Sequence, residues 1–352
     1  MTQVVSSMLT RRRFLEDSWA VALVLGGAAA AVSEAAARAG RATDAPADDW
    51  GPFVGPWKRY ASNPILPEPG ACPGPGSLIR YKGKWWMFLY NNNGHNTRLA
   101  VSEDGYDWRY VHDRPILTAE YRWEGSYALT KAALVIDGVV HLYYLGKQGI
   151  EERIGIATNS EPDLFTTAWL KHPDNPLLTR QHLSAPVQRV FPSTVVEEGG
   201  IYYLFLDAGY DYHHPVFPRQ YTINVASSRD GVRFEELAAD LIVPGPDGTW
   251  ESQAVCQSAV RKVGDWWYMI YSGFPKGASK SAQAFGLARA RRPEGPWQKY
   301  PGNPIFTATG NNEDWDGGFV QHACPVKIDG KWHLYYAGNQ RGVYRTGVVV
   351  RE

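Results

Sequence analysis

The amino-acid sequence predicts an all-β fold, a five-bladed β-propeller, from three observations. Five aromatic-rich segments recur along the chain, each next to a glycine turn. A short apolar run precedes each one, an Ala/Gly/Val-rich run follows, and an aromatic residue with an Asn-Pro or related segment completes the unit. Four short strands per unit are typical of propeller blades. The last unit stops after its third strand, whereas an unmatched fourth strand precedes the first unit, so pairing the two closes the ring.

Each blade is expected to run from an inner strand at the axis to an outer fourth strand. The inner strands are expected at residues 77–79, 133–135, 194–196, 258–260 and 325–328. The aromatic second strands are expected at 83–90, 140–145, 201–206, 265–271 and 331–336. The third strands are expected at 99–102, 154–157, 223–226, 285–288 and 346–349. The segment from Trp57 to Leu66 is expected to supply the fourth strand of the fifth blade.

The composition narrows the class of protein. The chain has 352 residues with 36 basic and 36 acidic side chains, so it offers no basic surface for nucleic acid or an anionic membrane. The 14 Trp, 20 Tyr and 12 Phe are mostly explained by packing between blades. Three cysteines, Cys72, Cys256 and Cys324, predict no disulfide framework. Buried thiols are favoured, and a bridge between Cys256 and Cys324 is the alternative.

Residues 1–39 are predicted to be a twin-arginine signal peptide. Arg11-Arg12-Arg13 precedes an uncharged stretch of 16 residues, 18–33, which is shorter than a membrane span requires. Small residues at 37–39 are the expected cleavage site. Residues 40–56 are expected to be a linker and residues 57–352 the propeller catalytic domain. The mature protein is therefore expected in the periplasm or outside the cell, without membrane association, and its oligomeric state stays open.

One face of the propeller is expected to carry the functional site. The connections from second to third strands are long and polar, at 91–97, 146–153, 207–222, 272–284 and 338–344, whereas most turns on the opposite face are short. Variable polar loops on a rigid ring are where binding and catalytic residues concentrate.

A tryptophan followed by an acid precedes the inner strand in three blades. The pairs are Trp123-Glu124, Trp250-Glu251 and Trp315-Asp316. Carboxylates that converge on the axis would suit glycoside hydrolysis, which uses an acid to protonate the leaving oxygen and a base or nucleophile opposite. The same repetition fits a device that locks the blade, with the acid bonded to neighbouring groups. The sequence gives the two interpretations equal weight.

A second set of candidates is expected on the same face. Asp207 or Asp211 with His322 forms the alternative catalytic group. Side chains suited to binding sugar are Tyr127, Lys131, Arg189, His214, Gln257, Gln321 and His95, together with the three tryptophans above. The sequence has no zinc-ligand spacing and no phosphate-binding glycine loop, so no cofactor is predicted. A single Ca²⁺ in the axial channel is the one metal left open.

The repeats resemble those of the five-bladed β-propeller glycoside hydrolases, which include glycoside hydrolase family 43, the invertases, the anhydro-galactosidases and the mannoside phosphorylases. The resemblance covers residues 57–352 and rests on segments such as 63–66, 84–90 and 100–108. The resemblance implies three catalytic acids at the starts of the inner strands. The segments 72–77, 190–193 and 321–325 hold no acid, so we do not assign these three family acids to residues of this chain. His322 lies near one expected acid, and the anhydro-galactosidases look like a precedent for a histidine acid.

These observations predict an exported glycoside hydrolase that cleaves a poly- or oligosaccharide by carboxylate acid–base catalysis in the axial funnel. We expect the catalytic roles to be shared by Glu124, Glu251 and Asp316. One is expected to be the acid, one the base and one a carboxylate that shifts the pKa of the others, and the sequence does not say which is which. One alternative is a non-catalytic carbohydrate-binding propeller. Another is a glycoside phosphorylase, transferase or lyase; for a phosphorylase, Lys131 and Arg189 would be the basic pair.

Overall fold

The computed structural model describes residues 49–66, 73–91, 93–184, 187–210, 221–277 and 283–352. The expected signal peptide, Cys72 and the candidates Asp211 and His214 lie outside these residues. Among the helices within the described ranges, none has the length and hydropathy of a membrane span.

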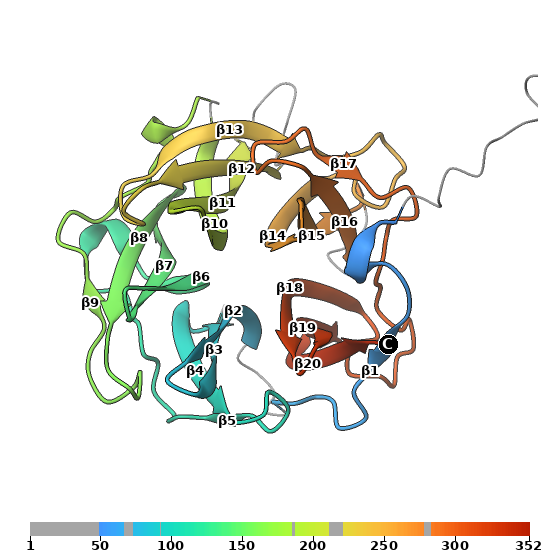
Figure 1. Ribbon diagram of the computed structural model, residues 1–352, viewed down its shortest axis with the longest axis horizontal. Helices are drawn as coiled ribbons and strands as arrows, with labels where there is room; N and C mark the ends of the chain where they lie inside the picture. Colours follow the sequence, from blue (N-terminus) through green and yellow to red (C-terminus); the bar gives the residue numbers. More distant parts are fainter. Residues whose placement is uncertain (1–48, 67–72, 92, 185–186, 211–220, 278–282) are drawn as a thin grey trace, which may run out of the picture. The chain divides into compact units, whose positions relative to one another are not determined.

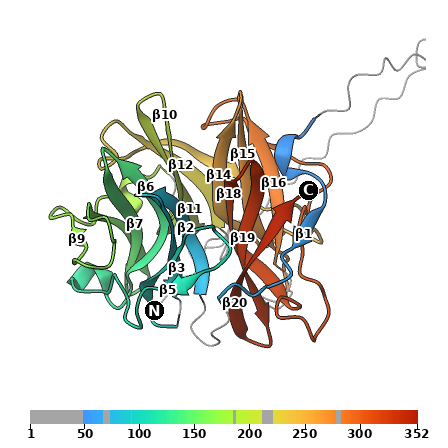
Figure 2. The same cartoon turned by 60° about the horizontal axis from the view of Figure 1, so that its bottom comes forward.

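Residues 50–352 form five four-stranded antiparallel sheets arranged as propeller blades (Figure 1, Figure 2), which confirms the predicted fold class. The inner strands are β2 (Pro73–Tyr81), β6 (Leu129–Ile136), β10 (Val187–Glu198), β14 (Ala254–Val263) and β18 (Phe319–Ile328). The second strands are β3 (Lys84–Asn91), β7 (Val139–Gln148), β11 (Ile201–Tyr210), β15 (Trp266–Phe274) and β19 (Lys331–Gln340).

The outer strands and three short helices complete the described elements. The third strands are β4 (Asn96–Ser102), β8 (Glu151–Asn159), β12 (Tyr221–Ser228), β16 (Ala284–Ala290) and β20 (Val343–Arg351). The fourth strands are β5 (Arg109–Tyr110), β9 (Leu170–Lys171), β13 (Glu235–Ile242), β17 (Gln298–Lys299) and β1 (Trp57–Arg59). The 3₁₀ helices are η1 (Gly51–Phe53), η2 (Arg122–Glu124) and η3 (Arg180–His182).

The first strand closes the ring, as the sequence predicts. β1 pairs antiparallel with β20, with Trp57 opposite Arg351 and Arg59 opposite Val349. Farther along, the Ile65 N–H donates to the Thr346 carbonyl at 3.0 Å. The fifth blade therefore has the same four strands as the others, and β20 does not leave an open edge.

The propeller domain begins earlier than the expected boundary at residue 57. Trp50 and Phe53, inside the expected linker, are 8% and 1% exposed and pack in the cluster that contains Tyr268 and Tyr336. The Arg289 guanidinium lies 4.1 Å from the Trp50 ring centre. The expected boundary is too late because it follows the start of the repeat, whereas η1 packs on the propeller ahead of it.

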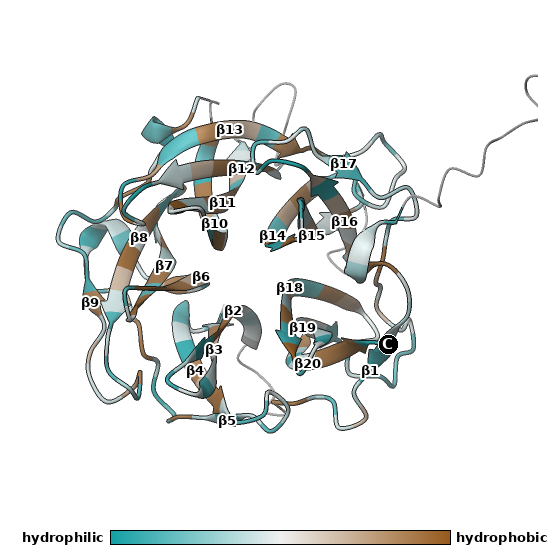
Figure 3. Cartoon of the chain, in the orientation of Figure 1, coloured by the Kyte–Doolittle hydropathy of each residue, from teal (hydrophilic) through white to brown (hydrophobic). Residues whose placement is uncertain are grey.

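The core lies between neighbouring blades. One cluster joins Trp86 and Phe88 of the first blade to Leu142 and Tyr144 of the second. Figure 3 shows apolar residues mainly on the strands and polar residues on the connections. Cys256 and Cys324 are both buried and free, so they are packed thiols rather than a bridge.

Each inner strand has a β-bulge at an equivalent level. The register with the second strand shifts between residues 75 and 77, 130 and 132, 192 and 194, 256 and 259, and 321 and 324. Gln257 and His322 have φ angles of 56° and 60° there. Because a bulge redirects the side chains beside it, these irregularities set the positions of Lys131, Gln257 and His322.

Candidate active site

Glu124 lies inside the second blade. Its side chain is 0% exposed. It accepts hydrogen bonds from the Tyr144 hydroxyl on β7 at 2.7 Å and from Lys171 Nζ on β9 at 2.9 Å. The Tyr121 N–H also donates to it at 2.8 Å. Both carboxylate oxygens therefore have partners within the blade.

Glu251 makes the same contacts in the fourth blade. The Tyr271 hydroxyl on β15 donates to it at 2.8 Å, and Lys299 Nζ on β17 at 2.5 Å. In both blades the carboxylate ties the second strand to the outer strand. We call this set of acid, tyrosine and cation the blade lock.

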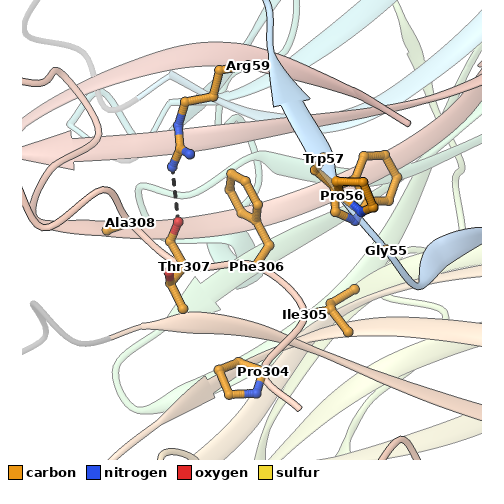
Figure 4. A pocket seen from close by; sticks show the side chains of 9 residues that line it. All are labelled: Gly55, Pro56, Trp57, Arg59, Pro304, Ile305, Phe306, Thr307 and Ala308. Carbon is orange, nitrogen blue, oxygen red and sulfur yellow. Dashed lines mark hydrogen bonds between the residues drawn. The ribbon is translucent and has the colours of Figure 1, made fainter. Parts of the chain in front are cut away.

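Asp316 completes a third blade lock in the closing blade. Its Oδ2 accepts from the Tyr336 hydroxyl at 2.7 Å and from Arg59 Nε at 2.9 Å. Figure 4 shows that Arg59 also donates to the Thr307 carbonyl, at 3.0 Å, near the Phe306 ring. The cation of this lock comes from β1, so the lock joins the start of the propeller to its last blade.

The tryptophan beside each acid packs on two glycines of its own blade. A Cβ built on Gly155 would lie 2.7 Å from the Trp123 ring, too close for a side chain there. Trp250 and Trp315 are placed in the same way, over Gly273 and Gly286 and over Gly338 and Gly347. The glycines allow the ring to lie flat on the second and third strands, so the tryptophan is part of the lock.

The contacts of the three acids match the lock interpretation rather than the catalytic one. Leu89 and Leu206 replace the tyrosine in the first and third blades, which also lack the Trp-acid pair. Acid, tyrosine and cation therefore occur together or not at all. We do not place Glu124, Glu251 and Asp316, or their tryptophans, in the catalytic centre, because each carboxylate binds the second and outer strands of its own blade.

Asp207 lies on β11 beside the starts of the inner strands. It is 2% exposed and accepts from Ser193 Oγ at 2.8 Å and from the Gln257 N–H of the next blade at 2.9 Å. Burial raises the pKa of Asp207 to about 6, although the Gln257 N–H and the Lys131 charge act in the opposite direction. A carboxyl group with a pKa near neutrality is suited to proton transfer.

Lys131 is at the bulge of β6 and is 2% exposed. Burial lowers its pKa, and the charge of Asp207 raises it. It lines one cavity together with Ser193 of the third blade and Cys324 of the fifth. Its side chain therefore lies near groups from several blades, at the axis of the ring.

Glu152 is a second carboxyl group on the same face, at the start of β8. Lys147 Nζ lies 3.5 Å from it. Burial raises the pKa of Glu152, and Lys147 and Arg189 oppose that rise. The Arg189 guanidinium lies 4.6 Å from the Tyr221 ring centre. Burial also raises the pKa of Tyr221, with further increases from Glu152 and Asp207, so the Tyr221 hydroxyl is near both carboxyl groups.

His322 and Gln257 extend this group toward the first and fourth blades. Burial and the Lys131 charge hold the pKa of His322 well below its usual range, so its imidazole is neutral. A neutral imidazole can bind a sugar hydroxyl, but it does not serve as a charged acid. Its ring lies 4.9 Å from that of Tyr90. The Gln257 Oε1 accepts from Ser272 Oγ at 2.9 Å, which fixes the amide.

The remaining candidates border this group. Gln321 is buried at the start of β18. The His95 ring stacks on Tyr127 at 3.9 Å and 18°. Lys147 Nζ lies 5.3 Å from the Tyr127 ring centre, and burial together with Lys147 lowers the pKa of His95. Lys147 therefore connects these rings to Glu152.

Sequence reasoning missed Glu152, Lys147 and Tyr221. Glu152 and Lys147 lie in the connection 146–153, which the sequence places on the functional face. An acid and a base at the two ends of one hairpin are a signal that could have identified them. Tyr221 had no such signal, because tyrosines are common along this chain.

The residues around the axis do not fit Ca²⁺. Within the described ranges, no three His, Cys, Asp or Glu side chains gather in a way that could hold a metal ion. Calcium takes roughly six to eight oxygen ligands. At the level of the bulges, Lys131 and Cys324 line the axial cavity. An ammonium and a thiol are unsuited to a hard cation.

A five-bladed ring with carboxyl groups and cations gathered at one end of its axis defines a class of carbohydrate-active propellers. The model of the family described as glycosyl hydrolases family 43 matches residues 61–351, and the chain belongs to this family.

Solved structures share the fold at low sequence identity. A thermostable family-43 glycoside hydrolase is 17% identical, with a TM-score of 0.64 over 81% of this chain and 91% of that one. A beta-1,2-mannobiose phosphorylase from Listeria innocua is 14% identical, with a TM-score of 0.61 over 84% and 97%.

A curated relative, a sucrose:sucrose 1-fructosyltransferase from Festuca arundinacea, is 27% identical over 139 residues. The match spans 37% of this chain and 21% of that protein. Membership of the family supports a glycosidase, and the solved structures show that the fold is shared.

Proposed function

We propose that this protein is an exported glycoside hydrolase that cleaves a glycosidic bond in a poly- or oligosaccharide, with Asp207 and Glu152 as its two carboxyl groups. The observation that carries the proposal is that both groups are buried, have a raised pKa and lie near the Tyr221 hydroxyl. Most glycoside hydrolases use two carboxyl groups, of which the one that acts as the general acid has a raised pKa. The export and the periplasmic or extracellular location rest on the arginines at 11–13 and the apolar stretch after them.

We assign Asp207 as the proton donor. Its pKa of about 6 keeps a substantial fraction protonated in mildly acidic solution. In the reaction Asp207 gives its proton to the leaving oxygen as the bond from that oxygen to the anomeric carbon breaks. Glu152, as the carboxylate, either takes a proton from a water molecule that attacks that carbon, or attacks the carbon itself to form a glycosyl-enzyme ester that water then hydrolyses. The Lys131 charge opposes the rise of the Asp207 pKa, so it stabilises the carboxylate that remains after the proton is transferred.

The neighbouring side chains supply contacts for a sugar. Arg189, Gln257 and His322 carry hydrogen-bonding groups at the starts of inner strands. Tyr90, Tyr127 and Phe191 form an apolar cluster with Leu129 and Leu145 on the same face. Polar donors beside aromatic surface are typical of sites that bind carbohydrate rings.

The test is the activity of Asp207→Asn and Glu152→Gln on a panel of aryl glycosides and oligosaccharides. Each variant is expected to lose activity by about 10²–10⁴-fold, the range for a missing acid or base. Asp207→Asn should keep more activity on glycosides with activated leaving groups, which need no protonation. Asp265→Asn is the matched control, since its side chain is 90% exposed on a turn between β14 and β15. Full activity of both site variants would refute the proposal.

A glycoside phosphorylase is the second candidate. Lys131 and Arg189, which act electrostatically on Asp207 and Glu152 respectively, would be its basic pair. A phosphorylase would require inorganic phosphate for cleavage and release a sugar phosphate. Turnover of the same glycosides in phosphate-free buffer would favour hydrolysis. Sugar binding measured by calorimetry without formation of any product would instead indicate a non-catalytic carbohydrate-binding propeller.

A further inference from the structure

The axis of the propeller contains a cavity that adjoins the proposed active site at Lys131 and Ser193 and continues away from it. Its volume is about 570 Å³. Near the bulges it is lined by Ser77, Lys131 and Cys324, and near the carboxyl ends of the inner strands by Arg80 and Lys327. Arg80 and Lys327 are exposed, so the cavity extends toward the face opposite Asp207 and Glu152.

The cavity has a strong excess of positive charge. Its charged lining residues are Arg80, Lys131, Arg261, Lys327 and Glu197, four cations against one carboxylate. The whole chain has no net charge, so this excess is local. A cation-lined cavity with low-dielectric walls concentrates anions from solution.

Lys131 is the innermost cation and has no hydrogen-bond partner for its Nζ among the residues that the structure describes. It is 2% exposed. A buried ammonium is unfavourable without a partner of opposite charge. Asp207 compensates only in part, because its raised pKa leaves it partly protonated near pH 6. An anion in the cavity would supply the missing contacts.

Arg261 is a second cation in the cavity lining and is held in place. Its Nε donates to the Pro325 carbonyl at 2.8 Å and its Nη1 to the Val260 carbonyl at 2.7 Å. Lys131 and Arg261 therefore line the same cavity from the second and fourth blades. The Ser77 hydroxyl in the same lining is a further donor. Two cations and a hydroxyl suit an anion, which is consistent with the poor fit of Ca²⁺.

We propose that the axial cavity binds a small inorganic anion, with Lys131 and Arg261 as its cationic ligands and Ser77 as a hydroxyl donor. Arg80 and Lys327, at the outer end, attract the anion from solution. The anion is either a halide or an oxyanion such as phosphate, since both match these donors. Lys131 borders both sites, but the inference does not depend on the proposed function, because anion binding does not require turnover.

The test is the thermal unfolding midpoint of the full chain, measured in chloride or phosphate against gluconate at constant ionic strength. An anion that binds only the folded state raises the midpoint in a saturable way. Chloride is expected to act if the site prefers a halide, and phosphate at lower concentration if it prefers an oxyanion. No effect of either anion would overturn the proposal. The readout is independent of turnover, so it succeeds or fails separately from the proposed glycosidase.

Substitutions in and outside the axial cavity test whether the anion binds there. Lys131→Met is expected to abolish the anion effect. Arg80→Gln combined with Lys327→Gln keeps the inner ligands and should weaken apparent binding about threefold through the lost attraction. Arg291→Gln, a control on an exposed side chain outside the cavity lining, should leave the effect unchanged.

A second measurement covers the case in which Lys131→Met fails to fold. Wild-type crystals soaked in bromide should show an anomalous peak at Lys131 in the cavity if the site takes a halide, and crystals soaked in phosphate should show density there if it takes an oxyanion. Both anions confined to the surface, or an anion effect equal in Lys131→Met and wild type, would overturn the proposal.

Discussion

The blade locks allow one comparison in which the same substitution is made in two environments. Lys171 and Lys299 make equivalent contacts, but the Lys171 side chain is 2% exposed with Glu124 at 0%, whereas the Lys299 side chain is 31% exposed. Lys171→Met leaves a carboxylate buried without its cation, which typically costs about 3–5 kcal/mol. Lys299→Met leaves Glu251 closer to water, so we expect a smaller loss of about 1–2 kcal/mol.

Urea unfolding at pH 7 measures both losses, with the wild type alongside. Adding Glu124→Gln to Lys171→Met should recover part of the stability, because the charge left unpaired is then removed. At a temperature where the fold persists, Glu124→Gln should keep its turnover. Equal losses for the two lysine variants would refute the burial argument, and a folded Glu124→Gln protein without turnover would restore the catalytic interpretation.

Two further predictions concern the tryptophan packing and Asp207. Gly155→Ala should destabilise by about 1–3 kcal/mol, because its Cβ would meet the rigid rings of Trp123 and Tyr144, and a urea midpoint equal to that of wild type would contradict this. The pKa of Asp207 rises from 3.8 to about 6 on folding, so the folded state binds more protons between these values. Its contribution to stability therefore falls by up to about 3 kcal/mol as pH rises from 4 to 6. Urea midpoints across this range should show the slope in wild type and a flatter one in Asp207→Asn.

The fold was predictable because its signal is repeated along the chain. Each strand of a blade has a typical composition, and five copies make the pattern clear even where one copy is weak. Closure by Trp57–Arg59 followed from counting strands. The contribution of Trp50 and Phe53 was not predictable, because it lies outside the repeat and depends on a surface made by distant strands.

The site was only partly predictable, because repetition in the sequence reflects structure more than chemistry. The Trp-acid pairs are conspicuous because three blades use the same lock, and their meaning depends on Lys171, Lys299 and Arg59 on distant outer strands. Asp207 was a candidate from the sequence, but its burial is a property of the assembled ring. Glu152 occurs once and has no counterpart that draws attention to it.

The three blade locks also differ in the chain length that each must close. Glu124 and Lys171 are 47 residues apart and Glu251 and Lys299 are 48, whereas Arg59 and Asp316 are 257 apart. Loop-closure entropy makes the last contact about 1.5 kcal/mol harder to form than the other two from an unfolded chain. The first two locks can therefore assemble within single blades early in folding, and the third forms when the two ends of the domain meet. The three locks make equivalent contacts in the folded ring. Two of them form within single blades, whereas the third forms only when the ends of the domain come together.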